Sequence, residues 1–252
     1  GGQPIGLEVK AQAFSFSKNN EVNNMTFYNY VVINRGTQTL NNTYFGQFAD
    51  PDLGCNQDDF AGCDVQRGLG FVYNWDDVDD GCSDPAYGPQ PPAIGIDFFE
   101  GPFQDYDLLD NPLSANCQDN VDSLGIPYGG IGIGYGDDIV DNERFGMRGF
   151  VYYSRVGANC CTDPSLAVHY YNYLRSIWKD GEAQTYGEDG YNPQIANAVP
   201  ARYMFPGDSD PVGWGTGCVP QAAWQEQAQT SPDRRFIQSA GPFTLEPGAY
   251  NN

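Results

Sequence analysis

Basic residues are scarce in this chain of 252 residues: 12 Lys and Arg stand against 33 Asp and Glu, and there is one histidine, His169. The net charge of −21 leaves no basic surface for the phosphates of a nucleic acid and disfavours contact with an anionic membrane. A single imidazole excludes a metal site built from several histidines. Ser-His-Asp or Cys-His catalysis would have to use His169, whose helical surroundings indicate packing instead.

Motifs of enzymes and of membrane proteins are missing too. The chain contains no P-loop, no dinucleotide-binding fingerprint and no HExxH sequence, and its cysteines form no CxxC pair. No apolar run approaches the ~20 residues of a membrane-spanning helix. We therefore expect neither an enzyme nor membrane insertion. Two carboxylates brought together by folding could still hydrolyse glycosides, because their separation is invisible in a sequence.

Acidic residues are abundant and concentrated in one segment. Between Asp50 and Glu143 there are 19 Asp and 2 Glu against one basic residue, Arg67. Short carboxylates among Gly, Asn and Pro are the ligands with which loops surround Ca²⁺. Because unneutralised charges at this density repel one another and oppose folding, we expect bound Ca²⁺ to offset them. The alternative is a set of solvated loops with Asx-turns.

Three acidic loops supply the candidate calcium ligands. The first is preferred, because two carboxylates two residues apart, a Gly turn and three more carboxylates nearby can converge on one ion. The second, over 74–80, can share that ion, hold its own, or be an exposed turn. The third lacks the DxDxDG order of an EF-hand. The candidates are Asp50, Asp52, Asp58, Asp59 and Asp64 in the first loop, Asp76 and Asp77 in the second, and Asp137, Asp141 and Glu143 in the third.

Seven cysteines in an acidic chain rich in Tyr and Asn favour an extracellular protein, because disulfides persist outside the cell. We expect at least one intrachain disulfide, between Cys55 and Cys63, which bracket the first acidic loop. The odd number leaves at least one thiol unpaired or joined to another chain. Each remaining cysteine is either in a further disulfide or a small buried thiol.

Short strand-like runs separated by Gly, Pro, Asn and Asp predict an all-β fold, mainly an antiparallel sandwich of the jelly-roll kind, in one domain. Long loops over 102–135 and 187–200 need ties, which ions or disulfides could supply. One short helix is expected within 163–180, capped by Asp163. Among the tryptophans, Trp75 stands between polar residues and is expected to be exposed, where it could bind a glycan. Strands are expected over 6–17, 25–33, 43–49, 70–73, 93–99, 150–154 and 202–205, the second as a central strand.

Long blocks of this sequence resemble a known group of proteins. The blocks are FADPDLGCNQDDFAGCDVQRGLGFVYN, PPAIGIDFFEGP, GYGDDIVDNERFGMRGFVYYS, YYNYLRSIWKDG, MFPGDSDPVGWGTG and DRRFIQSAGPFTLEPGA. They are similar to large secreted surface proteins of Bacteroidetes, of the kind exported by type IX secretion. The resemblance implies an extracellular fragment of a longer multidomain protein, and it says more about location than about activity. It also implies O-glycosylation of Ser123, which stands in the sequence Asp122-Ser123-Leu124.

Together these features predict a calcium-stabilised structural or adhesive module of a secreted or cell-surface protein. Its partners would be calcium ions, with glycans or other copies of the chain at the cell surface. The alternative functions are a carbohydrate-binding module that uses Trp75 and a non-catalytic portion of a secreted hydrolase.

Overall fold

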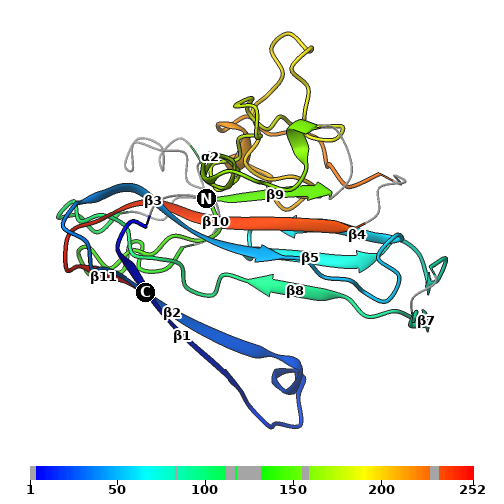
Figure 1. Cartoon of the computed structure of the whole chain (residues 1–252), viewed down its shortest axis with the longest axis horizontal. Coiled ribbons are helices and arrows are strands. Elements are labelled where there is room, and N and C mark those ends of the chain that lie inside the picture. Colours follow the sequence, from blue (N-terminus) through cyan, green and yellow to red (C-terminus); the bar gives the residue numbers. More distant parts are fainter. Residues whose placement is uncertain (1–3, 83–84, 112–116, 118–131, 155–158, 228–232) are drawn as a thin grey trace.

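The computed structural model describes residues 4–82, 85–111, 117, 132–154, 159–227 and 233–252. These residues form four antiparallel sheets and one short α-helix, which confirms the predicted all-β class (Figure 1). The layering of a sandwich or jelly roll stays a prediction. The strands are β1 Leu7–Ser15, β2 Thr26–Asn34, β3 Leu40–Ala49, β4 Asp59–Asp64, β5 Leu69–Asn74, β6 Val78–Asp79, β7 Gly88–Pro89, β8 Ile94–Asp97, β9 Gly149–Ser154, β10 Arg234–Leu245 and β11 Tyr250–Asn251; the helices are η1 Glu21–Asn24, η2 Asn159–Cys161, α2 Ala167–Tyr173 and η3 Trp214–Thr216.

The strand β10 is the centre of one sheet, with β3 on one side and β9 on the other. Its sequence did not predict a strand, since Gly241 and Pro242 interrupt the apolar pattern. The register with β3 shifts at this point, and such a bulge accommodates a proline that has no amide hydrogen to donate. The expected strand over 202–205 is wrong, because that segment makes a single bridge between Phe150 and Tyr203.

A second sheet, in the order β4–β5–β8, lies against the first and shares its hydrophobic core. Gly70 of β5 allows this approach. A Cβ there would lie 2.9 Å from the rings of Phe150 and Phe236. Gln238 of β10 donates a hydrogen bond to the Ile96 carbonyl of β8, at 3.0 Å, and so joins the two sheets.

A buried ion pair also connects β10 with β4. Arg234 Nε lies 2.7 Å from Glu226 Oε1, and both side chains are almost fully enclosed. Glu226 Oε2 in turn accepts a hydrogen bond from the Ala61 amide in β4, at 2.6 Å. Burial raises the pKa of Glu226, and the Arg234 charge opposes that rise.

The first two strands form a hairpin that projects from the rest of the molecule, which we call the arm (residues 7–34; Figure 1). The arm still contacts the body, since the Phe27 ring centroid lies 5.9 Å from that of Phe99 and the Tyr30 centroid 5.3 Å from that of Phe45. The strand β2 was expected to be a buried central strand. It does lie in the middle of the order β1–β2–β11, but β11 contributes only two residues, and most of β2 is at least partly exposed. The apolar residues on both faces of β2, which predicted a buried central strand, belong instead to a partly exposed arm.

The predicted helix is present but shorter than its expected range. It covers Ala167–Tyr173, and its N-cap is Leu166, which makes no side-chain capping bond. The expected cap, Asp163, instead accepts two hydrogen bonds of 2.7 Å from Arg235 Nη1. In the described part of the chain, no helix has the length and apolarity needed to cross a membrane.

Six of the seven cysteines form disulfides: Cys55–Cys82, Cys117–Cys218 and the adjacent pair Cys160–Cys161. The predicted Cys55–Cys63 disulfide is therefore wrong. Cys63 lies inside β4, 2% exposed, where its thiol donates to the Met204 carbonyl, and burial raises its pKa. The bond from Cys117 to Cys218 does tie the long loop that begins at residue 102, as the loop length led us to expect.

Candidate metal centre

The first two acidic loops meet at one end of the β4–β5 pair. Asp59 at the start of β4 lies opposite Asn74 at the end of β5, so their side chains share one face of the sheet. The Trp75 amide donates to the Asp58 carbonyl, at 2.8 Å, and continues the pairing into the loops. The Cys55–Cys82 disulfide then closes the outer ends of the two loops.

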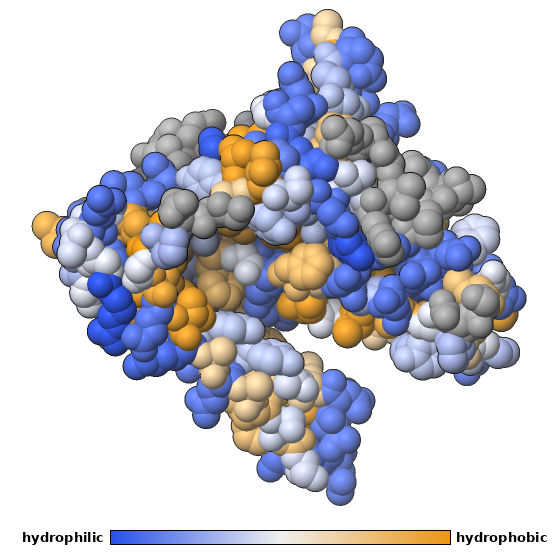
Figure 2. Space-filling view, in the orientation of Figure 1, coloured by the Kyte–Doolittle hydropathy of each residue, from blue (hydrophilic) through white to orange (hydrophobic). Residues whose placement is uncertain are grey.

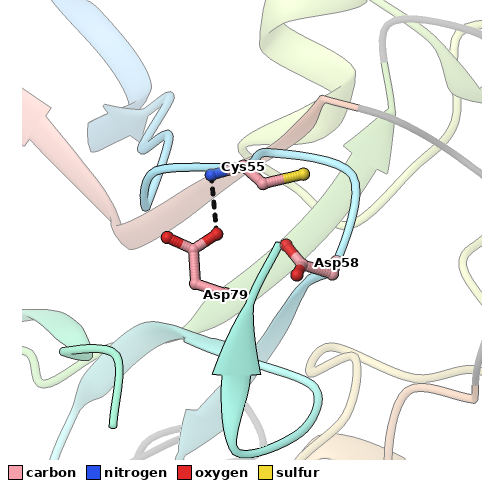
Figure 3. A group of neighbouring side chains, drawn as sticks. All are labelled: Cys55, Asp58 and Asp79. Atoms are coloured by element: carbon pink, nitrogen blue, oxygen red, sulfur yellow. Dashed lines mark hydrogen bonds between the residues drawn. The ribbon is translucent and has the colours of Figure 1, made fainter. Parts of the chain in front are cut away.

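Asp79 is the most enclosed carboxylate of this region, with no exposed surface. Its Oδ1 accepts a hydrogen bond from the Cys55 amide, at 2.8 Å, and its Oδ2 accepts one from Tyr87, at 2.5 Å. Gly54, with φ of 70°, allows this arrangement, since a Cβ at residue 54 would lie 1.9 Å from Asp79 Oδ2. In Figure 3 the carboxylates of Asp58 and Asp79 lie side by side beneath Cys55.

Side-chain atoms of Cys55, Asp58 and Asp79 all lie within 4.8 Å of one another, which is the spacing of ligands around one metal ion. The Cys55 sulfur is bonded to Cys82 and therefore cannot act as a thiolate ligand. The metal-binding capacity of the group thus comes from its carboxylates.

Three buried oxygen atoms at this end of the sheet lack a hydrogen-bond donor among the described residues: Asp58 Oδ1, Asp59 Oδ1 and Asn74 Oδ1. The other oxygen of each carboxylate is satisfied: Asp58 Oδ2 by the Asp80 amide and Asp59 Oδ2 by the Leu53 amide, both at 3.0 Å. A buried polar atom left without a partner costs about 1–3 kcal/mol. Asp59 is 1% exposed and Asn74 is 8% exposed, so bulk water does not reach these atoms freely.

The electrostatic environment of Asp59 is unfavourable for its ionised form. Burial, assisted by the neighbouring charges of Asp58 and Asp79, raises the pKa of this carboxyl to about 7, against the opposing effects of the Leu53 amide and Arg234. Without a cation the site therefore holds Asp59 partly protonated at neutral pH. A divalent cation would favour the ionised form and supply the missing partner of its free oxygen.

The remaining first-loop candidates lie elsewhere. Asp50 and Asp52 form a second group with Asp233, but Arg235 already pairs with Asp50 at 2.9 Å and with Asp233 at 3.1 Å. This guanidinium supplies the positive charge that an ion would bring. Asp64, at the far end of β4, accepts hydrogen bonds from the backbone and side chain of Arg67.

Asp76 and Asp77 of the second loop are exposed and do not join the group. Asp76 Oδ1 accepts a hydrogen bond from the Val78 amide two residues later, at 2.9 Å, which is the Asx-turn alternative. The loop nevertheless contributes Asp79, so a member of each loop meets at one place. The register of β4 with β5, which pairs residue 59 with residue 74, decides which carboxylates of the two loops meet.

The third-loop candidates, Asp137, Asp141 and Glu143, do not form a metal-ligand group among the described residues. Each carboxylate binds an amide instead. Asp141 Oδ1 accepts from the backbone at residues 107 and 108, Glu143 Oε1 accepts from residue 111, and Asp137 Oδ2 accepts from the side chain of residue 142. These carboxylates hold the loop around residue 108 against the loop around residue 140.

The remaining candidates are the tryptophans, the single histidine and the expected glycosylation site. Trp75 is 53% exposed, as predicted, and its ring centroid lies 6.2 Å from that of Phe60. The other three tryptophans are buried. His169 lies 3.4 Å from the Ser165 hydroxyl. Ser123, the expected glycosylation site, lies outside the described residues.

Asn74 and Asp79 were not among the expected ligands, although both belong to the second acidic stretch. The signal for Asn74 was the alternation of apolar residues along 69–74. If 59–64 had also been recognised as a strand, pairing the two strands would have placed Asn74 opposite Asp59.

Comparison of the chain with known protein families, with curated proteins and with solved structures finds no match. We therefore infer its function from its own residues.

Proposed function

We propose that this chain is a calcium-stabilised extracellular module with a structural or adhesive role, and that it binds Ca²⁺ where its first two acidic loops meet. One observation carries the proposal: three buried oxygens of Asp58, Asp59 and Asn74 have no hydrogen-bond donor among the described residues. Oxygen atoms without donors, beside three carboxylates, are what a hard cation needs.

The donor set favours Ca²⁺ over other ions. Asp58, Asp59, Asp79 and Asn74 offer carboxylate and amide oxygens, with no histidine and no free thiolate among them. Oxygen ligands suit Ca²⁺ and Mg²⁺, whereas Zn²⁺ prefers nitrogen and sulfur. Ca²⁺ accepts six to eight ligands in flexible geometry, so backbone carbonyls and water can complete its shell.

The ion would act together with the Cys55–Cys82 disulfide to fix the two loops against β4 and β5. Extracellular calcium modules bind with Kd of about 10⁻⁴–10⁻³ M, so the millimolar Ca²⁺ outside cells would fill such a site. Three disulfides support a location where thiols are oxidised. This role agrees with the expected origin in a secreted surface protein of Bacteroidetes, and it involves no catalysis.

A second candidate function is carbohydrate binding. The exposed Trp75 ring, next to Phe60 and close to the cation site, supports it, because an exposed aromatic face is a common platform for sugars. A glycan array with Trp75→Ala as the control would test it. Calcium-dependent binding that this substitution abolishes would favour the carbohydrate-binding module.

The test of the calcium proposal compares two aspartates that lie close together. Ca²⁺ at a hundredfold excess over Kd should stabilise the protein by about 2.7 kcal/mol, which raises the Tm of a chain of this size by about 5–10 °C. Asp59→Asn keeps the side-chain shape but removes the charge, and we expect it to weaken Ca²⁺ binding at least about tenfold. Titration calorimetry and thermal melts in chelator and in Ca²⁺ measure both effects.

Asp76→Asn is the matched control, because Asp76 is exposed and lies outside the proposed site. It should leave the affinity unchanged. An equal effect of both substitutions would show a diffuse acidic surface without a defined site. The absence of any binding heat and any shift in Tm would refute calcium binding altogether.

A further inference from the structure

One end of the sheet β3–β10–β9 gathers segments that are far apart in the sequence, next to α2 (Figure 1). Gly46 of β3 and Gly149 of β9 lie opposite the same residue of β10, so the two outer strands share this level of the sheet. Both glycines leave room for the chain that follows α2. A Cβ at residue 46 would lie 2.2 Å from Leu174 Cδ2, and one at residue 149 would lie 2.9 Å from Ser176 Oγ. Arg175, between Leu174 and Ser176, is therefore held at this end of the sheet.

Two further arginines lie at the same end. Arg148 directly precedes β9, and its backbone amide donates a hydrogen bond to the Ser239 carbonyl of β10, at 2.7 Å. The Arg202 carbonyl accepts hydrogen bonds from the Phe150 amide of β9, at 2.9 Å, and from the Ser176 hydroxyl, at 3.0 Å. The backbone thus brings three arginines from distant parts of the chain to one place.

Two tyrosines lie among these arginines. Tyr44 of β3 and Tyr171 of α2 pack edge to face, with ring centroids 6.0 Å apart, and the Arg175 guanidinium lies 5.2 Å from the centre of the Tyr171 ring. Burial raises the pKa of the Tyr44 hydroxyl, whereas the positive charges of the three arginines lower it. All three charges therefore act on one hydroxyl group.

These three arginines pair with no carboxylate in the described part of the chain, although the sequence contains 33 Asp and Glu. Hydrophilic side chains cover much of the face seen in Figure 2, and most charged residues of the chain are acidic. The missing counter-charge is therefore a property of this place and not of the composition. The other described arginines each pair with a carboxylate: Arg35, Arg67, Arg144, Arg234 and Arg235.

Arg148 is the arginine that most clearly needs a partner. It is 2% exposed, and its Nε and Nη2 are buried without an acceptor among the described residues. Burial, and then the charge of Arg202, lower the pKa of Arg148 to about 10, so the group is still charged at neutral pH. A buried charge without a partner opposes folding strongly. The Phe145 ring, 5.7 Å from the guanidinium, offsets only part of this cost.

We propose that this end of the sheet binds a small oxyanion, held by Arg148 and Arg202 beside Tyr44; we call it the arginine site. The Nε–H and Nη2–H groups lie along one edge of a guanidinium and point the same way, which matches two oxygens of a carboxylate, a sulfate or a phosphate. Exposure decreases from Arg175 through Arg202 to Arg148, so positive charge extends inward from the surface. The proposal goes beyond calcium binding and does not depend on it.

Titration calorimetry in metal-free buffer tests the arginine site with three probes: sodium sulfate, sodium phosphate and sodium acetate. Sodium chloride at the same ionic strength is the reference, so that screening stays constant. We expect saturable binding to one site per chain. The preferred probe distinguishes a tetrahedral anion from a carboxylate. Because a chain of charge −21 repels anions in general, non-specific accumulation of the probe is not expected.

Arg148→Met keeps most of the side-chain length but removes the charge, and we expect it to weaken binding of the preferred anion at least about tenfold. It should not lower the Tm in the chloride reference buffer, because an apolar side chain replaces a buried unpaired charge. Arg202→Gln, at a half-buried position, should weaken binding as well, and it serves if the first variant does not fold. Arg35→Gln makes the same change of net charge at an arginine that pairs with Glu8, and it should leave the affinity unchanged.

Three results would overturn the proposal. Binding of all three probes that is absent, or no tighter than that of chloride, would show that these guanidinium groups need no oxyanion. Equal weakening by Arg35→Gln would show an effect of overall charge without a defined site. A lower Tm of Arg148→Met with unchanged anion affinity would make Arg148 a packing residue. Since sulfate stabilises most proteins by exclusion from their surface, thermal shifts count only as the difference between the original protein and this variant.

Discussion

Asp59 illustrates how a single buried carboxylate can link stability to pH and to a cation. One of its oxygens accepts a hydrogen bond from Leu53, and the other has no donor among the described residues. Burial raises its pKa to about 7. The same effect, weaker, raises the pKa of Asp97 to about 6. The native state therefore holds protons that the unfolded chain loses near pH 4.

We predict that the metal-free protein loses stability as pH rises from about 4 to about 7. Over this range the folded state binds more protons than the unfolded state, so the free energy of unfolding falls with pH and levels off above the folded-state pKa. Ca²⁺ should flatten this decline, because it favours the ionised carboxylate. Urea denaturation between pH 5 and pH 8, with and without Ca²⁺, measures the slope.

Asp59→Asn separates this residue from the other carboxylates. The variant should show a clearly shallower pH dependence than the original protein in metal-free buffer, whereas Asp76→Asn should keep the original slope. Stability that increases between pH 5 and pH 7 would contradict the assignment of the raised pKa to Asp59.

At the scale of the elements, regular apolar alternation predicted most strands to within a few residues. The failures have physical causes. β4 begins with Asp59 and contains Gly62 and Cys63, so its residues resemble a loop although they are buried. β10 contains Gly241 and Pro242 at its bulge. Both strands are specified by packing between sheets, which a local pattern does not report.

The candidate site lies in the segment to which the excess of Asp drew attention, residues 50–80, but its members differ from those expected. Strand register decides that Asp59 faces Asn74 and that Asp64 lies at the far end of β4. Arginines distant in the sequence also decide which carboxylates stay free for a cation. Arg235, for example, pairs with Asp50. Cysteine pairing failed for the same reason, because it depends on contacts between distant elements.

The loop that carries Gly54 offers a test at this scale. We predict that Gly54→Ala destabilises the protein by about 2 kcal/mol or more, since a Cβ combines an unfavourable positive φ with a clash against Asp79 Oδ2. It should also weaken Ca²⁺ binding, because Asp79 must move. Chemical denaturation and calorimetry measure the two losses.

Gly81→Ala is the control for backbone strain alone. Gly81 also has a positive φ, of 91°, but an added Cβ would meet nothing within 4 Å. We expect a loss of about 1 kcal/mol and little change in affinity. Equal effects of the two substitutions would show that contact with Asp79 is unimportant.

The negative charge of the whole molecule is concentrated in one part of the chain. Residues 50–143 carry a charge of −20, while the rest of the chain sums to −1. Hydrogen bonds from backbone amides satisfy many of the carboxylates, as at Asp110, which accepts from residues 136–138. Such bonds orient the carboxylates but do not neutralise them, so repulsion among them still opposes folding.

We predict that salt stabilises the metal-free protein. Between about 0.02 M and 0.5 M NaCl the Debye length falls from about 20 Å to about 4 Å, so repulsion among the acidic loops is largely screened. Tm should rise by about 2 °C or more, which for a chain of this size corresponds to roughly 1 kcal/mol.

Choline chloride should have the same effect, because screening does not depend on the cation. In saturating Ca²⁺ the effect of salt should shrink, because the bound ion already offsets part of the acidic charge. A Tm that is constant or falls with salt would show that the acidic loops are already neutralised by contacts within the chain, and the need for a bound cation would disappear with that result.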